Sequence, residues 1–227
     1  MGLADWFREF DTDLKVKNVS SISTRYKNIP QRLNTDYWDT TSDTAHSLYV
    51  GSYGRRTAID GFSDLDMIFR LPYSVCERYD NYSGNGQSSL LQAVKQSIEK
   101  TYSTTSIRGD GQVILVPFTD GITFEVVPAF VNNDDSYTFP DANSGGWKTT
   151  NPKPEIEAIK NRNASCNNNL FSLCRMMRAW KNKWDVPIGG LLIDTLAYQF
   201  IENWEYRDKS YFYYDYMGRD FFKWVAD

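Results

Sequence analysis

A block of strand-like patterns between two blocks of helical spacing is the feature that most constrains the fold of this sequence. Short apolar runs of strand length occupy residues 47–50 and 65–71 and, approximately, residues 112–118 and 122–130. The Asp120-Gly121 step between the last two runs is a strong hairpin signal. On either side of the block, apolar residues recur three and four positions apart, as they do on a helix.

This order predicts an α+β fold with two lobes. We expect a lobe with a mixed sheet and flanking N-terminal helices over residues 1–150, and a helical lobe over residues 151–227.

Several helices can be placed from the same spacing. Two are expected over residues 3–14 and 19–37, and Pro30 should kink or divide the second. Inside the strand block, Ser88 is expected to cap a helix that runs to about residue 102. The later helices are expected from Pro154, which suits the first helical position, and over about 169–184 and 190–204.

Composition excludes several classes of protein. The 13 Phe, 15 Tyr and 7 Trp can supply a sizeable core, which excludes disorder as a description of the whole chain. A net charge of −4 argues against a protein that holds nucleic acid by bulk electrostatics. No apolar run approaches the ~20 residues of a spanning helix, so no membrane association is expected. The three cysteines are odd in number and fit no zinc pattern, so we expect free thiols and a cytoplasmic location.

The most informative stretch is GSYGRRTAIDGFSDLDMIF, residues 51–69. Asp64 and Asp66 are two positions apart, so on a strand both carboxylates point to one side. Adjacent carboxylates repel each other unless a cation neutralises them, and Mg²⁺ favours carboxylates and substrate phosphates. Gly51 and Ser52 directly follow a predicted strand, where a glycine backbone and a hydroxyl can approach phosphate oxygens.

A third carboxylate is expected to join them. Glu125 alternates with apolar neighbours on the predicted strand over 122–130. If that strand lies beside the one that carries Asp64 and Asp66, the three acids converge and can hold two ions ~3.5–4 Å apart. Such a site supports in-line displacement at phosphorus with no further protein nucleophile.

These motifs resemble the bacterial cGAS-like nucleotidyltransferases (CD-NTases) of the DNA polymerase β-like nucleotidyltransferase superfamily. The resemblance runs from about residue 16 to the end of the chain, and three stretches carry it: HSLYVGSYGRRTAIDGFSDLDMIFRLP (46–72), FEVVPAF (124–130) and SYTFPDANSGGWKTTNPKPEI (136–156).

The resemblance implies the fold and activity. It implies a nucleotidyltransferase lobe, a helical lobe and a cleft between them, and Mg²⁺-dependent synthesis of cyclic di- or trinucleotide second messengers from NTPs. It also implies a role in CBASS antiphage defence, with regulatory or effector proteins of a defence operon as partners. ATP is the expected substrate, and Mn²⁺ is expected to substitute for Mg²⁺.

The same resemblance assigns roles to particular residues. Asp64, Asp66 and Glu125 match the metal-binding acids, although Asp is commoner than Glu at the third position. Gly51 and Ser52 match the phosphate-binding pair. The helical lobe of the family usually extends further than this chain does, so we expect a truncated lobe.

Two basic residues of the helix over 169–184 are candidates for nucleotide binding. Arg178 in MMRAWK stands where family members often carry a phosphate-contacting Lys, and Lys181 follows one turn later. An ordinary solvated helix face is an equal interpretation of these residues. Asp60 precedes Gly61, a pattern more typical of a turn than of a fourth metal ligand. His46 is more typical of a polar residue at the start of a strand than of a substrate contact.

One loop and two alternative functions complete the expectations. Residues 131–152 show no periodicity and are expected to form a loop that leaves the Glu125 strand near the metals, with Trp147 or Lys148 facing the nucleotide.

The main alternative function is transfer of a nucleotide to an RNA, a protein or a small molecule, although no stable complex with a long nucleic acid is expected. The other is a silent nucleotide-binding scaffold, which the presence of all three acids disfavours.

Overall fold

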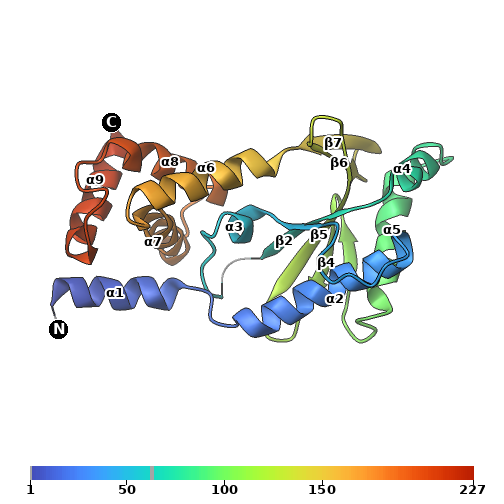
Figure 1. Cartoon of the computed structure of the whole chain (residues 1–227), viewed down its shortest axis with the longest axis horizontal. Coiled ribbons are helices and arrows are strands. Elements are labelled where there is room, and N and C mark those ends of the chain that lie inside the picture. The colour runs from blue at the N-terminus through green and yellow to red at the C-terminus, as the bar shows by residue number, and fades with distance from the viewer. Residues whose placement is uncertain (1, 62–63) are drawn as a thin grey trace. The chain divides into compact units, whose positions relative to one another are not determined.

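The computed structural model describes residues 2–61 and 64–227, which divide into two compact units (Figure 1). The sheet unit comprises residues 18–51 and 64–152, and the helical unit comprises, among the described residues, 2–17, 52–61 and 153–227. The mixture of a sheet with flanking helices and a group of C-terminal helices confirms the predicted α+β class.

The sheet unit is built on a mixed sheet. Its strands lie in the order β1-β2-β5-β4-β3, and β6 and β7 extend it from the end of β5. Strands β2 and β5 are parallel, and the other pairs are antiparallel. The bounds are β1 Ser47–Tyr49, β2 Leu65–Arg70, β3 Arg108–Asp110, β4 Val113–Pro117, β5 Thr123–Val131, β6 Tyr137–Asp141 and β7 Gly146–Thr150.

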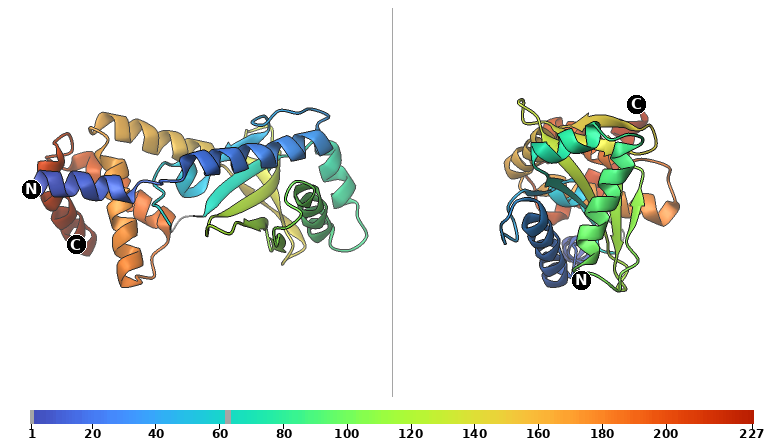
Figure 2. Two further views of the ribbon diagram at one scale, coloured as in Figure 1. Left: turned by 90° about the horizontal axis from the view of Figure 1, so that it is seen from below. Right: turned by 90° about the vertical axis from the view of Figure 1, so that its right-hand side faces the viewer.

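Three helices accompany this sheet: α2 (Val19–Tyr37), α4 (Tyr73–Asp80) and α5 (Gly86–Glu99), of which Figure 2 gives two further views. Pro30 lies inside α2 without dividing it. The cap of α5 differs from the prediction, because Asn85 is the N-cap and its side chain accepts a hydrogen bond of 2.8 Å from the Ser88 amide. Ser88 is therefore inside the first turn.

The two faces of the sheet differ in chemistry. One face carries a row of residues that are fully buried, Met67, Val126 and Ile114, which lie opposite one another in the register. Gly109 continues this row beneath α5, where an added Cβ would lie 4.0 Å from the Leu91 side chain. Since side chains alternate along a strand, the next residues of β2 and β5 must face the opposite way. That alternation sends Asp66 and Glu125 to the face away from α5.

The helical unit packs around its own core. Its longer elements are α1 (Leu3–Leu14), α6 (Pro152–Ser165), α7 (Asn169–Trp184), α8 (Gly190–Asn203) and α9 (Tyr214–Ala226), with a short η1 (Tyr211–Tyr213) before the last. Leu170, Leu173 and Ile201 of this core are completely buried. Among the described residues, no helix combines the length and apolar character needed to span a bilayer.

The predicted lobe boundary differs from this division. The sequence predicts that residues 1–150 form one lobe, but the contacts of residues 2–17 and 52–61 place these two segments with the C-terminal helices. The reason is apolar burial, because Phe7, Phe10 and Leu14 of α1 pack against the core of α7–α9. A local sequence pattern shows that α1 has an apolar stripe but does not show which core covers it.

The prediction that residues 131–152 form a loop is wrong. This segment contains β6 and β7, which form a hairpin in which Phe139 lies opposite Lys148. The hairpin joins β5 through Phe130 and Val131, at the far end of that strand from Glu125. At about 3.3 Å per residue, five residues separate Glu125 from Phe130 by roughly 17 Å. Trp147 donates a hydrogen bond to Asp80 and Lys148 pairs with Asp141, so neither side chain faces Glu125.

Candidate active site

The acids that the sequence singles out meet on neighbouring strands of the sheet unit. Strands β2 and β5 pair in register, with Asp66 directly opposite Glu125. Partners in a parallel pair share a face of the sheet, and the two carboxyl groups are close enough to hydrogen-bond to each other. Asp64 is exposed just before β2 and acts on Glu125 through its charge. The convergence of Asp66 and Glu125 follows from strand register alone.

Glu125 is perturbed by this environment. Burial raises the pKa of its carboxyl group, and the charges of Asp66 and Asp64 and the hydrogen bond to Asp66 raise it further, to about 7. A pair of carboxyl groups in contact can avoid repulsion by sharing a proton, or by binding a cation. The Asp66–Glu125 pair is therefore incompletely ionised near neutral pH without a cation.

This donor set suits a hard divalent ion. Carboxylate oxygens are the ligands that Mg²⁺ and Mn²⁺ favour, and the raised pKa of Glu125 shows that negative charge here lacks compensation. Within residues 2–61 and 64–227, no three His, Cys, Asp or Glu side chains already surround one point closely enough to hold an ion. The assignment of all three acids as metal ligands stays a prediction.

Asp110 is an acid near the site that sequence reasoning missed. It lies on β3, and its negative charge is one of the influences that raise the pKa of Glu125. In the register Arg108 lies opposite Leu115, which lies opposite Glu125, so the alternate positions Arg108 and Asp110 share the face of the acid pair. The signal in the sequence was weak, because β3 has only three residues and no apolar alternation.

Gly51 fits closely against the acid pair. Its backbone has φ +57°, and a Cβ built on it would lie 1.7 Å from an Asp66 carboxylate oxygen. The neighbouring Val50 amide donates a hydrogen bond of 3.0 Å to the Asp66 carbonyl. Only glycine permits this approach of the backbone to the carboxylate.

Replacing Gly51 with Ala should therefore damage the site more than the fold. The new methyl group has to displace the Asp66 carboxylate, and the left-handed backbone adds about 1–2 kcal/mol of strain. We expect the nucleotidyl transfer that the sequence predicts to fall by more than tenfold, with a loss of stability of about that strain. Steady-state kinetics and thermal melts measure the two effects. The Gly121→Ala variant is the control for strain alone, since Gly121 also has positive φ (+86°) but has no atom within 4 Å of the added Cβ. Equal losses of activity in both variants would contradict the close-contact explanation.

The other predicted nucleotide-binding residues belong to the helical unit. Ser52 is buried in the short helix α3 (Gly51–Gly54), and its carbonyl accepts hydrogen bonds from the Thr57 and Ala58 amides. Lys181 is half-buried on α7, and no ion pair is recorded for it among the described residues. Asp60 accepts a hydrogen bond of 2.9 Å from the Lys17 amide, in a turn.

Arg178 is engaged within the helical unit. It donates hydrogen bonds of 3.1 and 2.6 Å to the two carboxylate oxygens of Asp194 and one of 2.9 Å to the Gly190 carbonyl. Asp194 is completely buried and also accepts hydrogen bonds of 2.8 Å from the Arg55 and Thr57 side chains. Phosphate contact by Arg178 stays a prediction, and its observed role is to neutralise Asp194.

Sequence reasoning missed this buried hub of Asp194, Arg55 and Thr57. The available signal was Asp194 itself, which is the only charged residue in the stretch from Val186 to Ile201. A lone carboxylate on such a helix needs buried partners. Their identity could not be inferred locally, because Arg55 is 139 positions away along the chain.

Comparison with known proteins identifies the family. The model of the Second Messenger Oligonucleotide or Dinucleotide Synthetase domain matches residues 1–163. The chain belongs to this family. A probable cyclic nucleotide synthase of Bacillus cereus (strain VD146) is 26% identical over 182 residues, which cover 67% of this chain and 55% of that relative. The chain thus spans about half the length of the curated relative.

Solved structures of CD-NTases share the synthetase fold. The Rhodothermus marinus CdnE c-UMP-AMP synthase with Apcpp and Upnpp has 18% identity and a TM-score of 0.59, over 83% of this chain and 72% of that one. CdnC of E. coli MS115-1, in its complex with HORMA-deltaN, has 15% identity and a TM-score of 0.65, over 92% and 66%. These likenesses confirm the predicted fold family.

Proposed function

We propose that this synthetase-family chain makes a cyclic di- or trinucleotide second messenger from NTPs, in a Mg²⁺-dependent reaction that serves antiphage signalling. The observation that carries the proposal is the in-register contact of Asp66 with Glu125, with the Gly51 backbone against the Asp66 carboxylate. Nucleotides in the related structures, Apcpp and Upnpp in one and GTP and Apcpp in another, support NTPs as substrates. A cytoplasmic location, suggested by three free cysteines, belongs to the same proposal.

In this proposal Asp64, Asp66 and Glu125 would hold two Mg²⁺ ions, for which Mn²⁺ could substitute. When bound, the ions neutralise the triphosphate and lower the pKa of the attacking hydroxyl. The hydroxyl oxygen of one nucleotide attacks the α-phosphorus of another, and the bond from that phosphorus to the pyrophosphate oxygen breaks. The hydroxyl proton passes to a carboxylate oxygen of Glu125. The Gly51–Ser52 segment holds the phosphates, and Arg178 and Lys181 are the candidate additional contacts.

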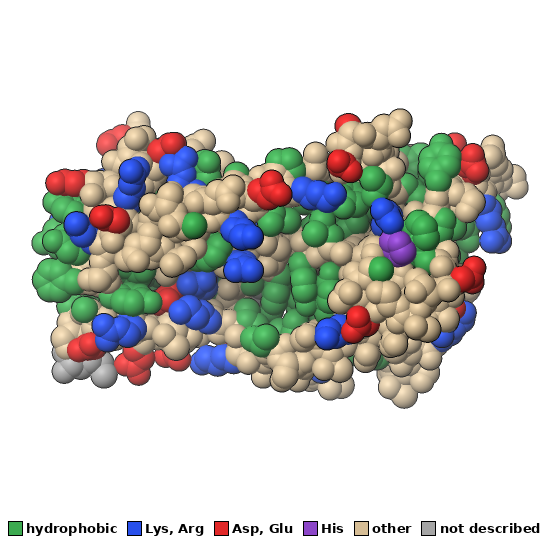
Figure 3. Space-filling model, in the orientation of Figure 1, with side chains coloured by type: hydrophobic (Ala, Val, Ile, Leu, Met, Phe, Trp, Pro, Cys, Tyr) green, Lys and Arg blue, Asp and Glu red, His purple; other side chains and the backbone are tan. Residues whose placement is uncertain are grey.

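The deciding assay uses the purified chain with all four NTPs and Mg²⁺ or Mn²⁺, followed by phosphatase treatment and mass spectrometry. A phosphatase-resistant cyclic product from free NTPs supports the proposal. On the face that Figure 3 shows, several Lys and Arg side chains gather, but the net charge of the chain is −4, which fits a small acceptor better than a long RNA. Products that form only after an RNA, protein or small-molecule acceptor is added would favour the alternative transferase.

Replacing Ser52 with Ala tests the phosphate contact. Loss of one hydroxyl donor to a phosphate oxygen should lower kcat/KM more than tenfold, which corresponds to about 1.4 kcal/mol. Ser52 is buried, and the backbone carbonyl that organises its loop is unchanged in the variant. Melting temperatures should therefore stay close to those of the wild type. Unchanged kinetics would remove Ser52 from the site.

A further inference from the structure

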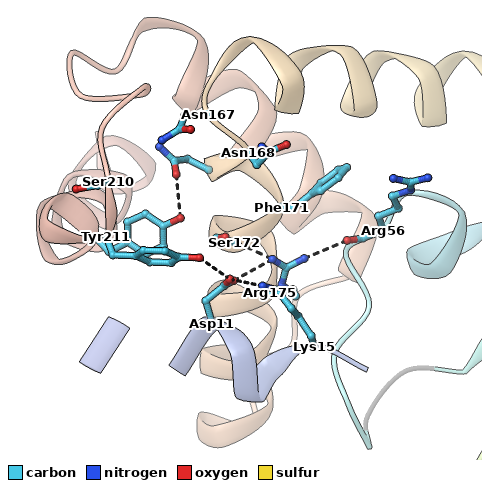
Figure 4. A pocket seen from close by; sticks show the side chains of 12 residues that line it. Asp11, Lys15, Arg56, Asn167, Asn168, Phe171, Ser172, Arg175, Ser210 and Tyr211 are labelled. Atoms are coloured by element: carbon cyan, nitrogen blue, oxygen red, sulfur yellow. Dashed lines mark hydrogen bonds and ion pairs between the residues drawn. The ribbon is translucent and has the colours of Figure 1, made fainter. Parts of the chain in front are cut away.

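A cavity of about 550 Å³ is lined only by residues of the helical unit, none of which is assigned to catalysis above (Figure 4). Its walls come from α1, from the segment that follows α3, from the start of α7 and from the turn at Ser210 and Tyr211. Figure 4 shows the Phe171 ring and the Arg56 side chain along one side of the cavity and Tyr211 along the other.

Positive charge prevails in the lining. Three basic residues, Lys15, Arg56 and Arg175, and one carboxylate, Asp11, line the cavity, which gives it a formal charge of +2. Asp11 is 1% exposed and is fully engaged: its Oδ1 accepts from Arg175 at 2.9 Å, and its Oδ2 lies 3.0 Å from the Lys15 ammonium. The Tyr211 hydroxyl donates a further hydrogen bond of 3.3 Å to Asp11. One carboxylate therefore holds two of the cations in place without neutralising the group.

Arg175 retains unused donor capacity. It is only 8% exposed, and its Nε has no hydrogen-bond partner among the described residues. Its remaining contact outside α7 and Asp11 is a long one of 3.4 Å to the Arg56 carbonyl. The Nε atom is shielded from solvent, so an anion in the adjoining cavity would interact with Arg175 through its positive charge rather than through this donor.

Three residues that line the cavity have a left-handed backbone conformation, which supports a binding role for the cavity. Arg56, Asn167 and Asn168 all have positive φ, at 62°, 52° and 62°. Asparagine tolerates this conformation, but arginine rarely adopts it because it is strained. The conformation at Arg56 fixes an exposed cation beside the cavity, and no ion pair is recorded for it among the residues that the structure describes.

We propose that this cavity binds a small phosphate-bearing ligand. Two guanidinium groups and an ammonium around one polar cavity match the several oxygens and the charge of a phosphate group. The Phe171 ring offers a surface on which a planar ring attached to the phosphate can stack. This binding is independent of the proposed synthase reaction, since it uses neither the acid pair nor Ser52.

The test is equilibrium dialysis of the whole chain against ³²P-labelled inorganic phosphate and, separately, AMP, in EDTA and without NTPs. The double variant Lys15→Gln/Arg56→Gln removes two exposed charges and leaves the buried Asp11–Arg175 pair intact. We expect saturable binding at one site per chain, weakened at least tenfold in the double variant. Lys17→Gln is the matched control: it removes an exposed charge just beyond α1, at a residue that pairs with Asp13 and does not line the cavity.

The comparison of AMP with inorganic phosphate distinguishes a nucleoside phosphate from free phosphate as the ligand. Tighter binding of AMP than of phosphate, lost in Phe171→Leu, would identify a nucleoside phosphate, and equal binding would identify the phosphate group alone. Thermal melts establish that each variant is folded. Absence of saturable binding, or equal binding by the wild type and the folded double variant, would overturn the proposal. Neither result bears on the synthase assay, which needs metal and NTPs.

Discussion

The Glu125→Gln variant should lose nucleotidyl transfer and, at the same time, become more stable than the wild type in metal-free buffer near neutral pH. In the proposed reaction the Glu125 carboxylate is a metal ligand and the proton acceptor. Losing several kcal/mol of charge stabilisation in the transition state lowers the rate by at least about 100-fold. The amide keeps the shape of the side chain but carries no charge. It therefore removes the repulsion between the carboxylates of residue 125 and Asp66 that is present in the wild type.

The stability gain should depend on pH with a definite sign. The pKa of Glu125 rises from 4.5 to about 7 on folding, so between these values the folded chain binds more protons than the unfolded one. Wild-type stability therefore falls as pH rises through that window, and Gln escapes the loss. Glu125 is only half-buried, so we expect a difference of about 1–2 kcal/mol above pH 7. The gap should close towards pH 4.5.

Thermal melts in EDTA from pH 4.5 to pH 8 measure this difference, and the NTP assay measures activity. At about 2–4 °C per kcal/mol for a chain of this size, the variant should melt a few degrees higher at pH 8. Glu77→Gln is the control, because Glu77 is exposed in the same unit and should change neither measurement. A variant that keeps activity, or that melts lower than the wild type at pH 8, would refute the assignment of Glu125.

The second large effect is expected at Asp194, where substitution with Ala should destabilise the chain by about 3–5 kcal/mol. Asp194 is completely buried and accepts hydrogen bonds from Arg55, Thr57 and Arg178. Removing it leaves Arg178 without its carboxylate and Arg55 with only Glu155, at 2.8 Å. Uncompensated buried cations cost more than the lost hydrogen bonds themselves.

Urea unfolding and thermal melts measure this effect, in a chain that does not need to be active. Asp194→Asn keeps the volume and half of the acceptor capacity, so its loss should be smaller than that of Ala but still large. Asp208→Asn is the matched control, since Asp208 is exposed in the same unit and, within residues 2–61 and 64–227, forms an ion pair only with Lys209, at 3.7 Å. A loss below about 1 kcal/mol in Asp194→Ala would show that the hub does not stabilise the fold.

Most of the sheet unit follows from local patterns. The predicted strand over 65–71 corresponds to β2, and the Asp120-Gly121 hairpin corresponds to the antiparallel pair β4 and β5. Runs with this composition have few alternatives to a strand, so neighbouring residues specify them. The prediction of a loop over residues 131–152 was wrong because β6 and β7 contain polar and proline residues. Such residues are stable as strands only when β5 supplies partners. Pairing with a distant strand does not appear in a local pattern.

The local sequence pattern determines one part of the acid pair, and the tertiary structure determines the other. The sequence by itself determined the strand that carries Asp66 and the alternation of Glu125 with apolar neighbours, because period-2 alternation depends only on neighbouring positions. Asp64, which was expected on the same strand, lies just before β2. The tertiary structure decided that β2 and β5 pair in register, which brings Asp66 to Glu125 across 59 positions of chain and raises the pKa of Glu125. It also decided that α1 packs with the C-terminal helices and that Asp194 meets Arg55. Contacts of this kind depend on which buried surfaces complement one another, and that is a property of the folded chain.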